Sequence, residues 1–456
     1  MKKFLMMAAT ALMVSNSTFA GGILTNTNQN AAFLRNPARG AVIAIDGVYS
    51  NPAGIAFMPE GFHLSVSWQA AWQKRQMDVT NPLFGLNADK QGATRSFEGV
   101  AKAPVIPSFQ AAYVINDKWS VSAQFAVGGG GGKCEFAEGL PMFEELIGGT
   151  LMQGVATNPQ LPGASLAGYG FQQNLTGKQY FYGFQVGGTY KLANNFSVFG
   201  GLRGVLANCS YTGAITNIAG DVKLSDAMAQ VMGTPILPGA AKSDDLVLDC
   251  SQSGFGITPI IGLDWNLGKL NLAAKYEFRT KINLENESNN SANLDAMASQ
   301  VPAVAVYADG AKVRSDIPAI LTLGAMYQIT DNFRAMGGFH YYWDKDAKGT
   351  PIKKGDNTWE ANLGVEWDVN DKILLSLGGQ RTQYGFDDTD MADTNFNISS
   401  TAICVGGAYK FSEKMKLNVG YMHSFYGNHE FINKNSTTCD YTRKNDVVGA
   451  SLDITF

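Results

Sequence analysis

The chain repeats one short pattern, written first as Tyr113-Val-Ile-Asn-Asp-Lys-Trp119 and later as Tyr327-Gln-Ile-Thr-Asp-Asn-Phe333. An aromatic residue is followed by one residue, an apolar residue, a short polar turn and a new run of alternating apolar and polar residues. The pattern starts at Tyr113, Tyr190, Trp265, Tyr327, Trp367 and Tyr409. The chain ends on Leu452-Asp-Ile-Thr-Phe456, the same strand ending without a turn. Each instance predicts a tight hairpin with an aromatic residue at one fixed height, as in the aromatic girdle of a transmembrane β-barrel.

The composition agrees with a surface that faces lipid. Charged residues make up 16% of the chain, compared with roughly 25% in typical soluble proteins. Glycine accounts for 51 residues and aromatic residues for 11%. No segment reaches the roughly 18 consecutive apolar residues of a membrane-spanning helix. A net charge of −4 without a basic run gives no indication of nucleic-acid binding.

Alternation with a period of two predicts fourteen strands. They are expected at 61–75, 96–116, 118–129, 177–192, 195–210, 249–267, 269–282, 313–330, 332–345, 356–369, 372–385, 399–411, 414–427 and 441–456. In 356–369 one face carries Leu363 and Trp367, and the other carries Glu360 and Glu366. A charged face opposite an apolar face fits a wet lumen with lipid outside. The short turns then lie on the periplasmic side, and long excursions lie on the other side at about 130–176, 211–248 and 283–312.

Two segments precede the first strand. Residues 1–20 have the features of a cleaved secretory signal, with Lys2 and Lys3, an apolar core and Thr18-Phe19-Ala20 at its end. Residues 21–60 are too apolar for a disordered tail and too rich in turns for a strand, so we expect a plug inside the lumen. The sequence thus predicts an all-β, 14-stranded antiparallel transmembrane barrel over residues 61–456, plugged by an N-terminal hatch, in a bacterial outer membrane.

The regular pattern is interrupted where the third strand ends. Five consecutive glycines stand there: Gly128, Gly129, Gly130, Gly131 and Gly132. Glycine weakens a strand and permits bulges or kinks. A kinked strand and the flexible root of a loop both fit this composition.

The long excursions contain apolar residues near helical spacing. The first carries Phe143, Leu146, Ile147, Leu151, Met152 and Val155, and the second carries Leu224, Met228, Val231 and Met232. Short helices that collect an apolar ligand and short helices that only bury one another both fit this spacing.

Alternation also points cations and cysteines into the lumen. The cations that we single out as contacts for a ligand carboxylate are Arg203, Lys275, Arg279 and Arg334. Cys209 and Cys250 flank one long loop at similar heights, so a disulfide between them and two unpaired thiols are both compatible with the sequence. The five cysteines show no zinc-ligand spacing, and we expect no metal or other cofactor.

These features together resemble one known family. The signal, Asn51-Pro52-Ala53 before the first strand, Pro107-Ser-Phe-Gln-Ala-Ala-Tyr113, the glycine-rich third strand and the terminal Phe456 are similar to the FadL/TodX family. The resemblance covers essentially the whole mature chain. Members of that family transport long-chain fatty acids and other hydrophobic compounds across the outer membrane.

The resemblance implies a route for the ligand. A hydrophobic groove between the long loops would capture it, residues 21–60 would form the hatch, and the third strand would kink inward at Gly128–Gly132 and open a lateral gap. A lateral exit would avoid aqueous transit, since each CH₂ kept from water is worth about 0.8 kcal/mol.

Other functions make different demands on the sequence. A general porin for small polar solutes is the main alternative, and it predicts an open lumen without the apolar leader. A hydrolase would need a nucleophile, a base and an orienting group, which the four histidines do not assemble, so we expect no enzyme. The loops could also serve as an adhesin or phage receptor. The sequence indicates neither the identity of the ligand nor more than a monomer.

Overall fold

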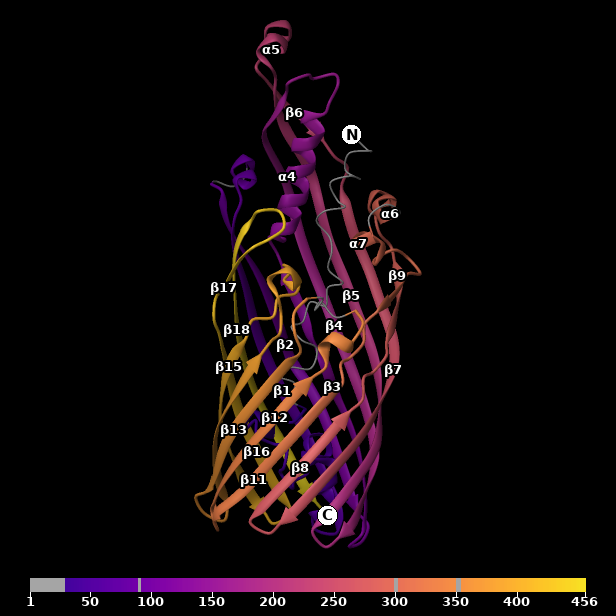
Figure 1. Cartoon of the computed structure of the whole chain (residues 1–456), viewed down its shortest axis with the longest axis vertical. Coiled ribbons are helices and arrows are strands. Elements are labelled where there is room, and N and C mark those ends of the chain that lie inside the picture. The colour runs from indigo at the N-terminus through magenta and orange to yellow at the C-terminus, as the bar shows by residue number, and fades with distance from the viewer. Residues whose placement is uncertain (1–28, 89–91, 299–301, 350–353) are drawn as a thin grey trace.

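A computed structural model of the chain describes residues 29–88, 92–298, 302–349 and 354–456. The signal segment 1–20 and the first residues of the predicted hatch lie outside the described residues. One long twisted sheet dominates the molecule, with short turns at one end and long extensions at the other (Figure 1). No helix of the described residues is long and apolar enough to cross a membrane.

The described sheet has eighteen strands, of which fourteen form the wall of a closed barrel. The wall strands are β1 (Gly61–Thr80), β2 (Thr94–Val114), β3 (Trp119–Phe136), β4 (Ser165–Ala193), β5 (Phe196–Lys223), β7 (Leu246–Leu267), β8 (Leu270–Glu277), β11 (Ile320–Thr330), β12 (Phe333–Tyr342), β13 (Thr358–Asp368), β14 (Ile373–Gln383), β15 (Ser400–Ser412), β16 (Met415–Tyr426) and β18 (Thr438–Thr455). Every neighbouring pair is antiparallel, and β18 pairs with β1 to close the ring. The predicted fold class and strand count are confirmed.

The four remaining strands are short and extend the wall at the end with the long connections. They are β6 (Ile236–Lys242), which pairs with β5, β9 (Asn283–Ser288) and β10 (Lys312–Arg314), which pair with each other, and β17 (His429–Ile432), which pairs with β18. Short 3-10 turns occur at η3 (Pro82–Leu86), η4 (Asp344–Asp346) and η5 (Asp388–Asp390).

The wall alternates as the period of two predicts. In β13, Glu360, Asn362 and Glu366 are each 2% exposed or less, whereas Leu363 is 72% exposed and Trp367 is 46% exposed. The aromatic residues of the repeated pattern stand at the end with the short turns. Five of the six, all except Tyr190, are exposed, and Tyr190 packs 4.5 Å from the ring of Trp119.

Two strands run much farther than the sequence predicts. β4 has 29 residues and β5 has 28, whereas a crossing strand needs about 9–11. Their upper halves rise above the rest of the wall (Figure 1). The period of two has no apolar signal there because segments such as Gln172-Gln173-Asn174 carry polar residues on both faces. The excursions expected at about 130–176 and 211–248 are therefore partly strand.

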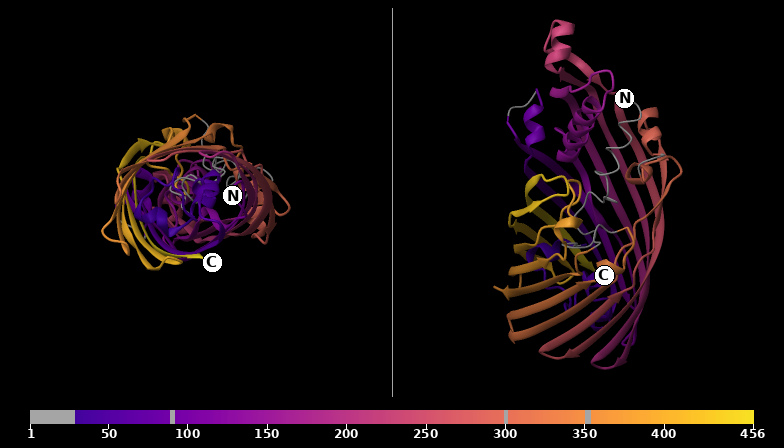
Figure 2. Two further views of the ribbon diagram at one scale, coloured as in Figure 1. Left: turned by 90° about the horizontal axis from the view of Figure 1, so that it is seen from below. Right: turned by 45° about the horizontal axis from the view of Figure 1, so that its top comes forward.

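Helices occur in these extensions and at the N-terminal end. α4 (Pro141–Ala156) and α5 (Asp226–Met232) form in the two excursions with helical spacing, and α6 (Ala292–Ala298) and α7 (Pro302–Ala305) form in the third. Ahead of β1, the chain forms α2 (Ala31–Arg35), α3 (Gly47–Ser50) and η2 (Pro52–Phe57). Seen from below, this indigo segment lies within the ring of strands (Figure 2).

Candidate functional site

The N-terminal segment, residues 29–58, contacts the wall on opposite sides of the lumen. α2 packs on β14, β15, β16, β18 and β1, while η2 packs on β2, β3, β4, β5, β7 and β8. Asn30 caps α2 by accepting a hydrogen bond from the Ala32 amide at 2.9 Å, and its amide donates to Ser65 Oγ at 3.0 Å and to Gln110 Oε1 at 2.8 Å. A residue type suited to capping thus also fixes the helix to two wall strands.

A buried ion cluster ties the same segment to β12 and β13. Glu366 accepts from Arg35 Nη1 at 2.5 Å, from Arg39 Nη1 at 2.9 Å and from Arg334 Nε at 2.8 Å. Arg39 also holds Asp46 through two bonds of 2.7 and 2.8 Å. The side chain of Glu366 is 2% exposed. Removing one member of such a cluster leaves buried charge uncompensated, which is strongly destabilising.

Asn51, Pro52 and Ala53 dock the other end of the segment. The Asn51 side chain accepts from the Gly54 amide at 3.3 Å and donates to Asp264 Oδ2 at 2.5 Å. The carbonyl oxygens of Pro52 and Ala53 accept from Thr189 Oγ1 at 2.9 Å and Ser197 Oγ at 2.7 Å. Pro52 begins the 3-10 turn, a position where its missing N–H costs nothing.

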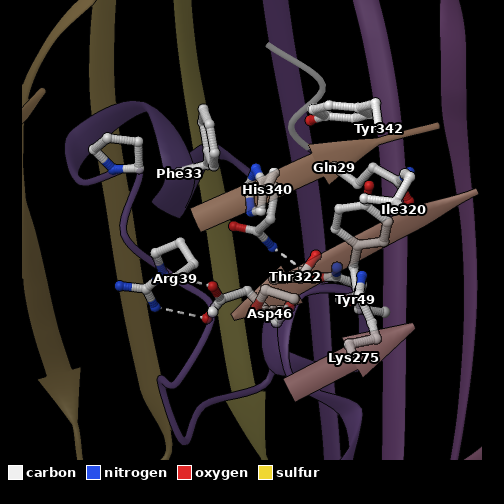
Figure 3. Close-up of a pocket in the computed structure, with 15 residues that line it drawn as sticks. Gln29, Phe33, Arg39, Asp46, Tyr49, Lys275, Ile320, Thr322, His340 and Tyr342 are labelled. Atoms are coloured by element: carbon white, nitrogen blue, oxygen red, sulfur yellow. Dashed lines mark hydrogen bonds and ion pairs between the residues drawn. The ribbon is translucent and has the colours of Figure 1, made fainter. Parts of the chain in front are cut away.

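A cavity lies between this segment and the wall. Figure 3 shows Phe33, Arg39, Asp46 and Tyr49 from the segment facing Thr322, His340, Tyr342 and Lys275 from the strands. Lys275 Nζ donates to the Tyr49 carbonyl at 2.7 Å and lies 4.1 Å from the centre of the Tyr49 ring. The cavity therefore combines aromatic surface with polar groups, of which Lys275 and Arg39 already have partners.

The wall is interrupted beside the glycine run. β2 pairs with β3 at Val100–Lys102 and again from Ser108 onward, and the residues between form no ladder pairs across this seam. Gly130 has φ +95°, and a Cβ there would collide with the Gln179 carbonyl of β4, so only glycine fits. On the β2 side, Pro104 and Pro107 lack the N–H that a ladder requires.

A second cavity lies beside this interruption. Gly128, Phe181, Val205, Arg203 and Glu277 are among the residues that line it. Gly128 also lies close to the N-terminal segment, since a Cβ there would be 3.5 Å from Gln29 Nε2. The interrupted seam, the segment and the lumen thus meet in one place.

The four predicted lumen cations are all paired with carboxylates. Arg203 Nη1 and Lys275 Nζ both contact Glu277, at 2.5 and 2.6 Å. Arg334 pairs with Glu366 and Asp368 at 2.7 Å each, and Arg279 lies 3.8 Å from Asp316 nearer the mouth. The structure brings Arg203 and Lys275 together and keeps the other two apart.

The helix of the first excursion, α4, lies beside a groove at the top of the molecule. Leu146, Ile147 and Leu151 of α4 are buried in an apolar cluster with β4 and β5, and Phe143 and Met228 pack against its edge. Met232 is 51% exposed at the tip. This groove lies between α4 and β6, and its lining includes Leu151, Val155, Leu161, Val222, Ala241 and Lys242.

The β14–β15 loop anchors α4. The Asp393 carboxylate accepts from the Met142 amide at 2.6 Å at the first turn of the helix and also accepts from the Tyr441 hydroxyl. An anion at a helix N-terminus is stabilising. Burial nevertheless raises the pKa of Asp393 to about 6.

The remaining predictions concern cysteines and metals. Cys209 and Cys250 are buried free thiols, which is the second of the two alternatives. Cys209 is opposite Gln252 and Cys250 is opposite Tyr211. They are therefore diagonal neighbours, about 7–8 Å apart, a separation beyond the usual Cα distances of disulfides. Within the described ranges, no group of three or more His, Cys, Asp or Glu side chains could hold a metal ion.

Some of the residues in these contacts were not among those singled out from the sequence. Arg35 and Arg39 are two cations within an apolar leader, and that contrast was the available signal for a buried cluster. Pro104 and Pro107, opposite the glycines, were the available signal for the interrupted seam.

Solved structures share the fold over nearly the whole chain. A Pseudomonas aeruginosa FadL homologue has a TM-score of 0.67 at 16% identity, covering 96% of this chain and 100% of that one. The P. putida toluene transporter TodX has a TM-score of 0.56 at 12% identity, with coverage of 96% and 98%. The Ralstonia pickettii toluene transporter TbuX has a TM-score of 0.52 at 13% identity, with coverage of 94% and 98%. A search of curated proteins finds no match.

The family comparison extends beyond fold. The profile of the family described as outer membrane protein transport protein (OMPP1/FadL/TodX) matches residues 169–456, more than half of the chain. The predicted location in the bacterial outer membrane is thereby confirmed. This chain belongs to the OMPP1/FadL/TodX family of outer-membrane transporters of hydrophobic compounds.

Proposed function

We propose that this protein transports long-chain fatty acids or similar hydrophobic molecules passively across the outer membrane and releases them sideways into the bilayer. The observation that carries the proposal is the interrupted β2–β3 seam, with the cavity that Gly128 lines. A missing stretch of ladder leaves backbone groups that strands would otherwise pair, and membrane barrels normally tolerate this only where the backbone is covered or wet. A passage for the ligand through the wall would explain why the ladder is interrupted here.

Capture would take place in the groove between α4 and β6. Its lining is mainly aliphatic and includes Lys242. Met228 packs against the apolar cluster that contains Leu151 and Val155, and methionine adapts to ligands of varied shape. The similar structures from P. putida and R. pickettii are toluene transporters, so small aromatic hydrocarbons fall within the proposed ligand class.

The N-terminal segment would act as the hatch. It crosses the lumen, and the Glu366 cluster and Asn51 hold it at two ends. A ligand that reaches the cavity in Figure 3 would be separated from the periplasmic end by residues 40–58. It would also lie near Gly128, because Gln29 lines the cavity and lies beside Gly128. This arrangement does not favour the general porin.

Replacing Gly130 by valine tests the lateral route. The new side chain would collide with the Gln179 carbonyl and disfavour φ +95°, so the backbone of the interrupted stretch should be displaced. Uptake of a fluorescent fatty acid into vesicles containing the protein should fall about tenfold or more, the expected result if the seam is the exit. The matched control is Gly200→Val, since a Cβ at Gly200 meets nothing within 4 Å. Uptake through a folded Gly130→Val barrel at the control rate would overturn the proposal.

A further inference from the structure

Six arginines are buried among the described residues: Arg35, Arg39, Arg75, Arg95, Arg203 and Arg443. Four of them form ion pairs with Glu366, Asp46, Glu144 or Glu277. The other two, Arg75 and Arg443, make no ion pair with a described carboxylate. Residues 1–28 contain neither aspartate nor glutamate.

These two arginines are directly opposite each other. Arg75 of β1 and Arg443 of β18 are register partners on the inner face of the wall, and they are 1% and 5% exposed. Like charges in directly opposed positions are destabilising, and burying a charge without a counter-charge costs several kcal/mol. The strands thus hold two positive charges together at a dry site.

The β14–β15 loop covers this pair with neutral groups. Arg75 Nη1 donates to the Thr394 carbonyl at 2.9 Å, and Arg443 Nη1 donates to the Phe396 carbonyl at 3.1 Å. The rings of Phe396 and Tyr426 lie 5.9 and 5.2 Å from the two guanidinium carbons. Arg443 Nε is buried with no hydrogen-bond partner among the described residues. Carbonyls and rings satisfy part of the donor capacity and supply no negative charge.

We infer that Arg75 and Arg443 form a binding site for the carboxylate head group of an amphipathic ligand, which the β14–β15 loop occupies when ligand is absent. A carboxylate can accept parallel bonds from guanidinium groups. Phe396, Ile398, Phe431 and Tyr441 belong to one apolar cluster beside the pair, and this cluster suits an alkyl tail. The inference rests on the proposed function for the apolar part of the ligand.

The loop also connects this site to the capture groove. Asp393, two residues before the Asn395 turn, holds the first turn of α4. A carboxylate that displaces the carbonyls of Thr394 and Phe396 would move the loop that anchors this helix. Binding of the head group at the arginines would thereby shift α4, which lines the capture groove.

The test uses dodecanoate and 1-dodecanol, two probes with the same alkyl chain, and the full chain in lipid nanodiscs at neutral pH. The double variant Arg75→Gln with Arg443→Gln should bind dodecanoate about tenfold or more weakly, with dodecanol affinity changed by less than about twofold. The control is Arg381→Gln, an exposed arginine that bonds Thr401 and Gln383. It should leave both affinities unchanged.

The thermal unfolding temperature separates a ligand role from a structural one. Because the arginines repel each other, the double variant should be at least as stable as the natural protein. Equal weakening of both probes, or unchanged dodecanoate affinity, would overturn the inference, whereas binding of dodecanol by the natural protein would still support the proposed function. If the natural protein binds neither probe, both the inference and the proposed function fail.

Discussion

The N-terminal segment contacts a continuous, charged part of the wall at β12–β13 and an interrupted part of the wall at β2–β3. At β12–β13, Arg35 and Arg39 reach Glu366 across an unbroken ladder of paired strands. At β2–β3 the ladder stops for several residues, and the segment contacts these strands through neutral groups, among them Gln29 and Asn30. One barrel therefore holds the N-terminal segment through buried ion pairs on one side and has an interrupted ladder on the other.

Disrupting the Glu366 cluster on the β12–β13 side should give the largest loss of stability. Glu366→Gln removes the carboxylate that compensates three arginines, so we expect a loss of about 3–5 kcal/mol in the free energy of unfolding. The N-terminal segment should detach from β13, and planar-bilayer recordings should show new ion conductance. The control is Glu98→Gln, because the Lys74–Glu98 pair is about half exposed and should contribute less than about 1 kcal/mol. If the Glu366→Gln variant showed no new conductance and no loss in the free energy of unfolding, the Glu366 cluster would not be what holds the N-terminal segment to β13.

Asn51→Ala should have an intermediate effect at the other end of the segment. It removes a donor to the buried Asp264 carboxylate, which keeps the bond from Asn271 at 2.9 Å. We expect destabilisation by about 1–3 kcal/mol and faster proteolysis of the segment. Asn428→Ala is the matched control, since Asn428 bonds Asp440 at an exposed site, and it should change stability by less than about 0.5 kcal/mol. Equal effects of the two substitutions would show that docking at Asn51 is unimportant.

The last effect concerns the loop that anchors α4, and its size falls to nearly nothing as the pH is lowered toward 4. Burial raises the pKa of Asp393 to about 6, from an ordinary value of 3.8. A raised carboxyl pKa means that the folded state binds the proton more tightly than the unfolded state. Asp393 therefore favours folding below about pH 4, and that contribution is lost as the pH rises through about 6.

Asp393→Asn should accordingly raise the thermal unfolding temperature above pH 6, by an amount equivalent to about 1–3 kcal/mol. The advantage should shrink as the pH falls toward 4. A stability difference between the natural protein and this variant that does not change over this range would show that the carboxyl group is not held in a dry site.

Local patterns in the sequence predict the barrel but not the contacts that cross it. The aromatic turns at Tyr113 and Trp367 and the alternation in β13 depend on neighbours a few residues away, so the sequence alone predicts them. The Arg35–Glu366 bond joins residues 331 positions apart, and only the closed ring brings them together. The upper halves of β4 and β5 were missed because, away from lipid, neither face needs to be apolar.

The seam between β2 and β3 was predictable only in part. The glycine run indicated a kink or a loop root, and the pairing shows a strand that continues to Phe136 after the interruption. Which residues of β2 lose their partners depends on register, and register is set by the whole barrel.

The lateral route can be tested by mapping where a photoreactive fatty acid attaches during uptake into vesicles. Val105, in the interrupted stretch of β2, is 64% exposed, and Val186, on the intact β4 wall, is 60% exposed to the same lipid. A lateral exit predicts labelling at Val105 and the adjoining glycines that excess unlabelled fatty acid competes away, with only background labelling at Val186. Labels that instead run down the lumen to residues 40–58, with none above background at Val105, would contradict it.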